Sequence, residues 1–355
     1  MDKKKIIIIA SVLLLIILIW IIFGGAIRNK LFTNKLETLG YSGKEIKLIE
    51  EKVFSDDYDL VTTSKNDEVI DVISAKGYRG ENLKKYLDYY SKYKNCDMED
   101  IITIVNSGYD LSKYEPTSTL ADLVTEKYYI YDNTSKYLKY YSNNENISLD
   151  KVVGLVNSKA DNKFYTNTKN ADLNKGNLIL VNKYYYLKDN YIPDDLVTLT
   201  NKYNGGTNNM MRKDAANAFM EMVDAALLDN IILKNMSAYR SYNYQVNLYD
   251  KYVQKDGKEA ADIYSARPGY SEHQTGLCTD INDISSSFEG TDASNWLVDN
   301  AYKYGFILRF PKGKEDITGY TYEPWHYRYV GKNAAKIIHD NDLTLEEYYA
   351  YYLDK

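Results

Sequence analysis

The first apolar segment of the chain differs in kind from everything that follows it. Three lysines at positions 3–5 precede an uncharged apolar run at residues 6–27. As a helix, this run would span roughly 33 Å, which is enough to cross the hydrocarbon core of a bilayer. A cleaved signal peptide has a shorter apolar core, although the GGA sequence at residues 24–26 would suit a cleavage site. We therefore predict a signal anchor, a transmembrane helix at residues 1–30, with cleavage as the alternative.

The charges around this run indicate its orientation. The leading lysines favour an N-terminus in the cytoplasm, although basic residues on the other flank weaken the bias. We expect a single-pass protein of the cell membrane whose remaining residues lie outside the cytoplasm.

Residues 31–165 are predicted to form a helical, repetitive region. Residues 85–91 (KYLDYYS) recur as residues 136–142 (KYLKYYS), and VNS at 105–107 recurs at 156–158, both at an offset of 51 residues. Similarity at a fixed offset indicates stacked supersecondary units. The region contains no histidine and no acid–base constellation. We therefore predict a stalk or spacer, with a module that binds a polymer or a protein partner as the alternative.

A polar stretch rich in Asn and Asp, residues 158–177, separates this region from a second domain at residues 175–355, with the boundary near residue 170. Short apolar or alternating runs predict strands at 177–182, 231–233, 277–281, 306–310 and 327–330. Apolar residues at helical spacing predict helices at 212–230, 245–253 and 296–304. Strands and helices do not alternate regularly, so the predicted fold class is α+β.

Composition narrows the possible partners of the chain. The formal net charge of −6 is mild, so no nucleic acid or other polyanionic partner is implied. The two cysteines, Cys96 and Cys278, are too few for a disulfide framework, and we expect both to be free thiols.

Two of the three histidines lie in short segments that also contain carboxylates, residues 271–280 (SEHQTGLCTD) and 323–326 (EPWH). The connection from His273 to Asp280 is short enough for both side chains to reach one ion, and His326 begins another predicted strand. These three ligands would leave a fourth tetrahedral position open for water, as a catalytic zinc site requires. The pattern therefore predicts a zinc centre that activates water.

Such a site also needs a group that moves protons. We favour Glu323, which lies three residues before His326 and is held extended by the following proline. Glu272 is the rival, but it adjoins His273, and adjacent side chains usually point apart. Cys278 is expected on the same strand face as Asp280. It is interpreted as a small buried thiol, with a role as a metal ligand as the alternative.

Two further residues have a predicted place around this centre, and the third histidine of the chain is interpreted separately. Arg240, in the SAYRS sequence at 237–241, could stabilise an oxyanion, although taken alone it also suits a surface ion pair. Trp325 could form a wall of the pocket. His339 is interpreted as a histidine at a helix C-terminus, where the helix dipole favours it.

Taken in order, these motifs resemble one family. SAYRS at 237–241, RPGYSEHQTG at 267–276, Asp280 and EPWH at 323–326 resemble the VanY-type D-alanyl-D-alanine carboxypeptidases, zinc peptidases related to the VanX dipeptidases. The resemblance covers about residues 175–340 and does not extend to the helical region. It implies a small antiparallel sheet with helices packed around it.

The resemblance also implies roles for individual residues. One zinc ion would be held by His273, Asp280 and His326, with Glu323 as general base and acid and Arg240 as stabiliser of the tetrahedral intermediate. The implied substrate-site residues are Ser271, Gln245 and Tyr239. The substrate would be a peptidoglycan stem peptide, cut before its C-terminal D-alanine. Cys278 is a departure, because a small residue such as alanine is expected there.

The predicted function is that of a membrane-anchored carboxypeptidase whose catalytic domain faces the cell wall. An LD-carboxypeptidase acting on tetrapeptide stems would share the whole metal apparatus and stays open, and an endopeptidase is a minor option. From another class, a non-catalytic protein that binds the cell wall would have lost Glu323, Arg240 or a zinc ligand, and all of these are present.

Overall fold

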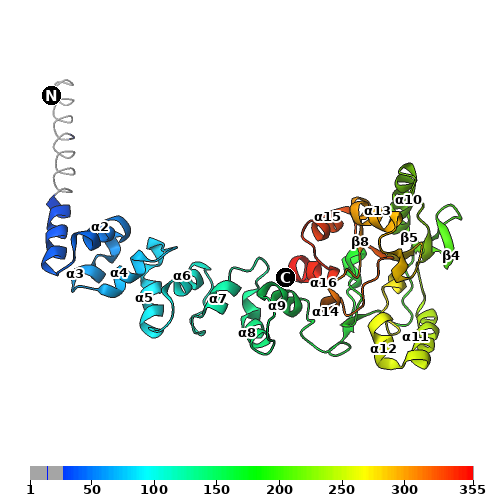
Figure 1. Cartoon of the computed structure of the whole chain (residues 1–355), viewed down its shortest axis with the longest axis horizontal. Helices are drawn as coiled ribbons and strands as arrows, with labels where there is room; N and C mark the ends of the chain where they lie inside the picture. The colour runs from blue at the N-terminus through cyan, green and yellow to red at the C-terminus, as the bar shows by residue number, and fades with distance from the viewer. Residues whose placement is uncertain (1–13, 15–26, 355) are drawn as a thin grey trace, which may run out of the picture. The chain divides into compact units, whose positions relative to one another are not determined.

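The computed structural model describes residue 14 and residues 27–354. The predicted membrane helix at residues 1–30 falls almost entirely outside this part of the chain. Within the part described, no helix is both long and apolar enough to cross a bilayer. The chain divides into two compact units between Tyr131 and Asp132, and both are drawn in Figure 1.

The first unit consists of helices joined by short turns. Residues 27–38 are helical, and the helices that follow are α2 (Gly43–Lys52), α3 (Asp59–Thr62), α4 (Asp67–Ser74), α5 (Leu83–Lys92), α6 (Met98–Asn106) and α7 (Ser118–Leu123). Their apolar faces meet in a core that includes Leu36, Ile49, Val69, Tyr86 and Ile101. This unit confirms the helical prediction for its part of the chain.

The second unit combines helices with a small sheet. Its helices are α8 (Thr134–Ser142), α9 (Leu149–Asn157), α10 (Lys213–Leu228), α11 (Tyr242–Asp256), α12 (Lys258–Tyr264), α13 (Asp292–Asn300), α14 (Glu315–Thr318), α15 (Lys332–Asp340) and α16 (Leu345–Tyr348). Its strands are β1 (Lys169–Asn170), β2 (Tyr185–Tyr186), β3 (Leu196–Thr198), β4 (Asn204–Asn208), β5 (Met210–Arg212), β6 (Asn235–Ser237), β7 (Cys278–Ile281), β8 (Phe306–Leu308) and β9 (His326–Tyr329). This content confirms a mixed helix and sheet fold.

The main sheet of this unit has five strands in the order β4-β6-β7-β9-β8. The pairs β6–β7, β7–β9 and β8–β9 are antiparallel, whereas β4 pairs with β6 in parallel. The expected antiparallel sheet is therefore mixed at one edge. Two smaller pairs, β1–β2 and β3–β5, lie outside it.

Alternation along the strands divides the sheet into an apolar face and a polar face. Ile281 of β7 and Tyr327 of β9 join the core formed with Phe219 of α10. Their neighbours Asp280 and His326 point to the opposite face. Figure 1 draws α10 and α13 on one side of the strands and α11 and α12 on the other. The polar face is where the predicted metal ligands come together.

The sequence repeat corresponds to a recurring hydrogen bond between two helices. In the first copy, α5–α6, the buried hydroxyl of Tyr86 donates to Asn106 Oδ1 at 2.5 Å. In the second copy, α8–α9, Tyr137 donates to Asn157 Oδ1. Tyrosine and asparagine therefore recur at the same offset because each pair joins two helices of one repeat.

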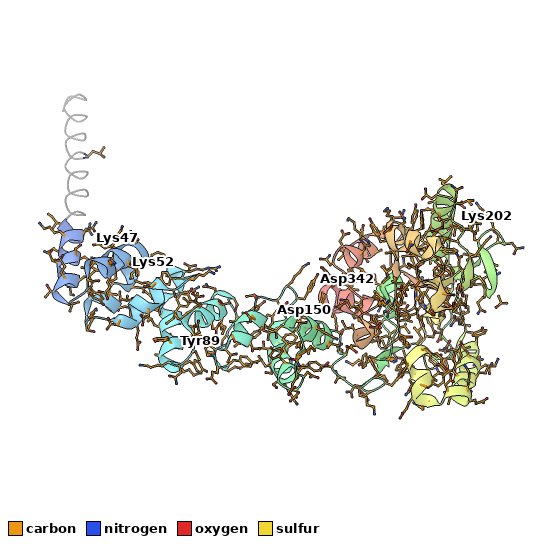
Figure 2. The ribbon with its side chains drawn as sticks, in the orientation of Figure 1. Lys47, Lys52, Tyr89, Asp150, Lys202 and Asp342 are labelled. Atoms are coloured by element: carbon orange, nitrogen blue, oxygen red, sulfur yellow. The ribbon has the colours of Figure 1, made fainter. Side chains whose placement is uncertain are left out.

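The second copy of the repeat packs against other helices of the second unit. Lys151 on α9 pairs with Asp316 on α14 at 2.6 Å. A Cβ at Gly154 would lie 3.1 Å from Glu347 Oε1 on α16, so this helix and α16 approach closely. Asp150, labelled in Figure 2, marks α9. The unit boundary at residue 131 therefore differs from the predicted boundary near residue 170, because α8 and α9 belong to the second unit.

Two predicted strands are absent from the described residues. In each run, a side chain donates a hydrogen bond to backbone carbonyls that a neighbouring strand would otherwise use. The apolar run at 177–182, in which residues 179–182 are buried, forms no strand, since the Arg328 guanidinium donates to the carbonyls of Asn177 and Ile179 at 2.9 and 2.7 Å. The run at 231–233 precedes β6, and the amide of Asn282 donates to the carbonyl of Ile232 at 2.8 Å. Short apolar runs do not distinguish these arrangements from a strand.

Candidate metal centre

The three predicted metal ligands lie together on the polar face of the sheet. Asp280 on β7 and His326 on β9 are direct cross-strand partners, so their side chains share that face. His273 lies in a 3₁₀ turn, Glu272–Thr275, which ends at Gly276 in the left-handed region (φ 68°) just before β7. A left-handed residue favours glycine, and this turn brings His273 back over the strand. All three ligands are at least 95% buried.

The distances among these side chains suit one small ion. His273 Nε2 lies 3.5 Å from Asp280 Oδ2, and His326 Nδ1 lies 3.3 Å from Asp280 Oδ1. Bonds of about 2.0–2.1 Å from zinc would place neighbouring atoms of a tetrahedral shell about 3.3 Å apart. Asp280 Oδ1 is buried with no hydrogen-bond partner among the described residues. Two imidazoles and an unpaired buried carboxylate oxygen therefore fit a zinc ion.

Neighbouring groups set the orientation of each imidazole. His273 Nδ1 lies 2.7 Å from the carbonyl oxygen of Ala238, which can only accept a hydrogen bond. The proton of a neutral His273 is therefore on Nδ1, and the lone pair of Nε2 faces Asp280. His326 is turned the other way, with Nδ1 toward Asp280 and Nε2 lying 3.6 Å from Glu272 Oε2.

Glu272, the rival candidate for the base, belongs to a buried network of charged side chains. Its Oε1 accepts hydrogen bonds from Arg309 Nε at 2.6 Å and Arg328 Nη1 at 2.9 Å. Arg309 also binds Glu346 through two nitrogens, at 2.8 and 2.6 Å. Burial opposes the ionisation of Glu272, but Arg309 and Arg328 outweigh it and hold the pKa of this carboxyl far below its usual value. Glu272 therefore stays ionised and supports His326 from behind.

Glu323, the preferred candidate, is placed differently. Its Oε2 lies 3.3 Å from His326 Nδ1, on the side of the ring that faces Asp280, and its side chain keeps 13% of its exposure. The turn before β9 holds it, since the Glu323 N–H donates to the Phe310 carbonyl and its own carbonyl accepts from the N–H of His326. Glu323 is thus adjacent to the ligands and reachable from solvent, as a proton carrier must be.

Arg240 reaches the same centre from the segment after β6. Its Nε donates to Ser237 Oγ at 2.9 Å, and its Nη2 donates to Asp280 Oδ2. Burial opposes the ionisation of Asp280, but His273 and Arg240 outweigh it and lower the pKa of this carboxyl well below its usual value. Arg240 is therefore a cation at the metal centre and not a surface ion-pair former.

Cys278 lies in the same cluster. It is a free thiol, fully buried, two residues before Asp280 on the polar face of β7. His273, Cys278 and His326 each offer a ligand atom, and these atoms lie within 4.8 Å of one another. Burial raises the pKa of the thiol, but His273 and His326 outweigh this effect and lower it to about 7.

A cavity of about 490 Å³ opens onto these residues. The predicted site residues that line it are His273, Asp280, His326, Glu323, Arg240, Ser271, Gln245 and Trp325. Gln245 donates to the carbonyl of Ala266 at 2.8 Å, while its Oε1 is buried without a hydrogen-bond partner in the described residues. Tyr239 is also buried but is not among the residues that line the cavity. Its N–H donates to the carbonyl of Met210, the first residue of β5.

Sequence reasoning missed the arginines that hold Glu272. Arg309 and Arg328 are both fully buried, and each lies in or beside a strand predicted from apolar residues. A charged residue within such a strand is rarely buried without a partner, and this was the available signal. His339 lies in the last turn of α15 as predicted, where it stacks on Tyr302 with 3.8 Å between the ring centroids.

Comparison with known proteins places these residues in a family. The model of the VanY family, described as D-alanyl-D-alanine carboxypeptidase, matches residues 208–332. The chain is 50% identical to YodJ of Bacillus subtilis over 181 residues, which is 48% of the chain and slightly less than two thirds (66%) of YodJ. It is 34% identical to a D-alanyl-D-alanine carboxypeptidase of Enterococcus faecalis, over 55% of the chain and 74% of that protein.

A solved structure of the LdcB LD-carboxypeptidase is also similar. It has 46% sequence identity and a TM-score of 0.50, and the similarity covers 52% of this chain and 91% of that one. The predicted resemblance is therefore confirmed, and the chain belongs to the VanY family of D-alanyl-D-alanine carboxypeptidases.

Proposed function

We propose that the protein is a zinc carboxypeptidase that removes the C-terminal D-alanine from peptidoglycan stem peptides. The observation that carries this proposal is the buried set of His273, Asp280 and His326, with Glu323 and Arg240 against it on the wall of one cavity. Membership of the VanY family supports the substrate class.

The metal would be held by His273 Nε2, His326 Nδ1 and a carboxylate oxygen of Asp280. Zinc bound there supplies a Lewis acid, which lowers the pKa of water to roughly 7 and polarises the scissile carbonyl. The Ala238 carbonyl beside His273 Nδ1 and the Glu272 carboxylate near His326 Nε2 keep both rings in the orientation that binding requires.

The chain's own groups carry out the remaining steps. Glu323 takes the proton from the attacking water and returns it to the leaving amine of the terminal D-alanine, since its carboxylate is beside the ligands and open to the cavity. Arg240 stabilises the negative charge that develops on the carbonyl oxygen. Hydrogen bonds to Ser237 and Asp280 hold this guanidinium in place.

The substrate peptide would lie in the same cavity. Ser271 and Trp325 line it, and the unpaired Oε1 of Gln245 offers an acceptor to a peptide N–H. Tyr239 is not part of this proposal, because it does not line the cavity.

The membrane anchor and the location of the enzyme are part of the proposal. The apolar run at residues 6–27 would hold the protein in the cell membrane, with its catalytic unit outside and facing the cell wall. The helical repeats would separate the anchor from the catalytic residues.

A second candidate activity is LD-carboxypeptidase cleavage of tetrapeptide stems. The similarity to the LdcB structure supports it, at 46% identity. Both activities would use the same metal ligands, base and arginine, so the choice depends on how the cavity receives the residue before the terminal D-alanine.

One experiment tests the activity and separates the two candidates. Defined pentapeptide and tetrapeptide stems are incubated with the zinc-loaded protein, and the products are identified by mass spectrometry. Loss of one alanine from the pentapeptide supports the DD activity, whereas loss from the tetrapeptide alone supports the LD activity. If neither peptide is shortened, the proposed enzyme function is wrong. Glu323→Ala is the matched control, and it should bind zinc but release no alanine.

A further inference from the structure

Cys278 occupies a position in the metal cluster that the proposed mechanism does not use. Its thiol is fully buried on the polar face of β7, and Asp280 follows two residues later on the same face. The strand pairing sets Cys278 opposite Arg328 and Asp280 opposite His326. Both side chains of β7 therefore point toward the space beneath the two imidazoles.

The separations in this space allow sulfur to bind the same ion as the histidines. The ligand atoms of His273, Cys278 and His326 lie within 4.8 Å of one another. Zinc bonds of about 2.3 Å to sulfur and 2.0–2.1 Å to nitrogen would place these atoms about 3.3–3.6 Å apart in a tetrahedral shell. The three atoms are therefore near enough to one another for a single ion to hold them.

An unpaired polar atom points independently to a ligand at this place. Asp280 Oδ1 is buried without a hydrogen-bond partner among the described residues, whereas His326 Nε2 faces Glu272. Buried polar atoms without partners are rare in folded proteins. The cluster therefore has an atom that could bind a metal ion and that its internal hydrogen bonds do not use.

We infer that Cys278 is a fourth protein ligand of the metal, and that its sulfur competes with water for the open position. The inference rests on the proposed function only in taking the ion as zinc. Binding forms one sulfur–metal bond and releases the thiol proton to solvent, because the thiolate is the form that binds. A closed set of two imidazoles, one carboxylate and one thiolate resembles structural zinc sites, whereas hydrolysis needs a water ligand.

This competition has two consequences with opposite signs. The extra ligand strengthens metal binding, so Cys278→Ala should weaken zinc affinity by about tenfold or more. The same change frees a coordination position for water, so kcat should rise in the zinc-saturated variant. A thiol that only fills space would not move these two quantities in opposite directions.

The direct test is spectroscopic and uses the full chain. Cobalt(II) is substituted for zinc, and a thiolate-to-cobalt charge-transfer band is sought in the near ultraviolet. X-ray absorption at the zinc edge provides a second readout, with a sulfur neighbour expected at about 2.3 Å. The wild type should show both signals, and Cys278→Ala and Cys278→Ser should lack them.

Cys96→Ala is the matched control, because Cys96 is the other free thiol and lies in the first unit. This variant should keep both signals. A wild type without a sulfur signal would overturn the inference, and so would a Cys278→Ala variant that retains it. Since the readout does not depend on turnover, a sulfur signal in a protein that releases no alanine would leave this inference standing while the proposed function fails.

Discussion

Replacing Glu272 with glutamine tests the support that the buried charge network gives to the metal centre. The change keeps the volume of the side chain but removes the charge that faces Arg309, Arg328 and His326. We expect zinc to bind more weakly and the protein to be less stable, because one carboxylate serves both the arginines and the imidazole.

The structure sets the size of both effects. Loss of a group that holds a metal ligand in its orientation typically weakens metal binding by about 10–100-fold. Glu272 Oε2 lies 3.6 Å from His326 Nε2, slightly beyond hydrogen-bond distance, so the lower end, about tenfold, is expected. Breaking a buried ion pair costs about 3–5 kcal/mol. Arg309 keeps Glu346 as a partner, so we expect about 3 kcal/mol.

Glu346→Gln separates the two effects. Glu346 pairs with Arg309 at 2.6 Å and accepts from Asn182 at 3.0 Å. It should lose comparable stability while keeping its affinity for zinc. Urea unfolding of the metal-free proteins gives the stability, and competition with a chromophoric chelator gives the zinc affinity. The reasoning is refuted if Glu272→Gln binds zinc as tightly as the wild type, or if both variants lose affinity equally.

Three further predictions concern single side chains. Arg240→Met should lower kcat by about 10²–10³-fold through loss of oxyanion stabilisation. Metal analysis that finds zinc retained would show that loss of the metal is not the cause, and an unchanged kcat would remove Arg240 from the mechanism. Burial opposes the ionisation of Asp262, but its hydrogen bonds from Arg267 and Tyr249 lower its pKa to about 2, so its contribution is complete above about pH 4 and is lost as the pH falls toward 2. After allowance for solvent screening we expect about 1 kcal/mol, and Asp262→Asn should flatten the stability curve in that range; a parallel curve would contradict this. Tyr137→Phe should destabilise the second unit by about 1 kcal/mol, measured by chemical unfolding, because Asn157 loses the hydroxyl donor, and an unchanged midpoint would show that this bond is dispensable.

The clustering of the three candidate ligands could be predicted from sequence because these residues lie in short segments with defined local geometry. Asp280 and His326 fall in strands whose alternation assigns their faces, and His273 precedes the first strand by a tight turn. The choice of Glu323 over Glu272 also follows locally, since Glu272 adjoins His273 in the chain.

The parts that sequence did not predict depend on contacts between distant segments. Arg328 turns the apolar run at 177–182 away from strand pairing by binding its carbonyls. The position of Glu272 depends on Arg309, and α9 joins the catalytic unit through Lys151 and Asp316. Such pairings between residues far apart in the chain leave no periodic signal in the sequence.

The proposed function is tested most directly by measuring D-alanine release from a defined pentapeptide stem by the zinc-loaded protein, compared with Glu323→Ala at equal zinc content. We expect release by the wild type, none above background by the variant, and loss of wild-type activity on chelation that is restored by zinc. Release that persists in Glu323→Ala, or in wild-type protein stripped of metal, would contradict it.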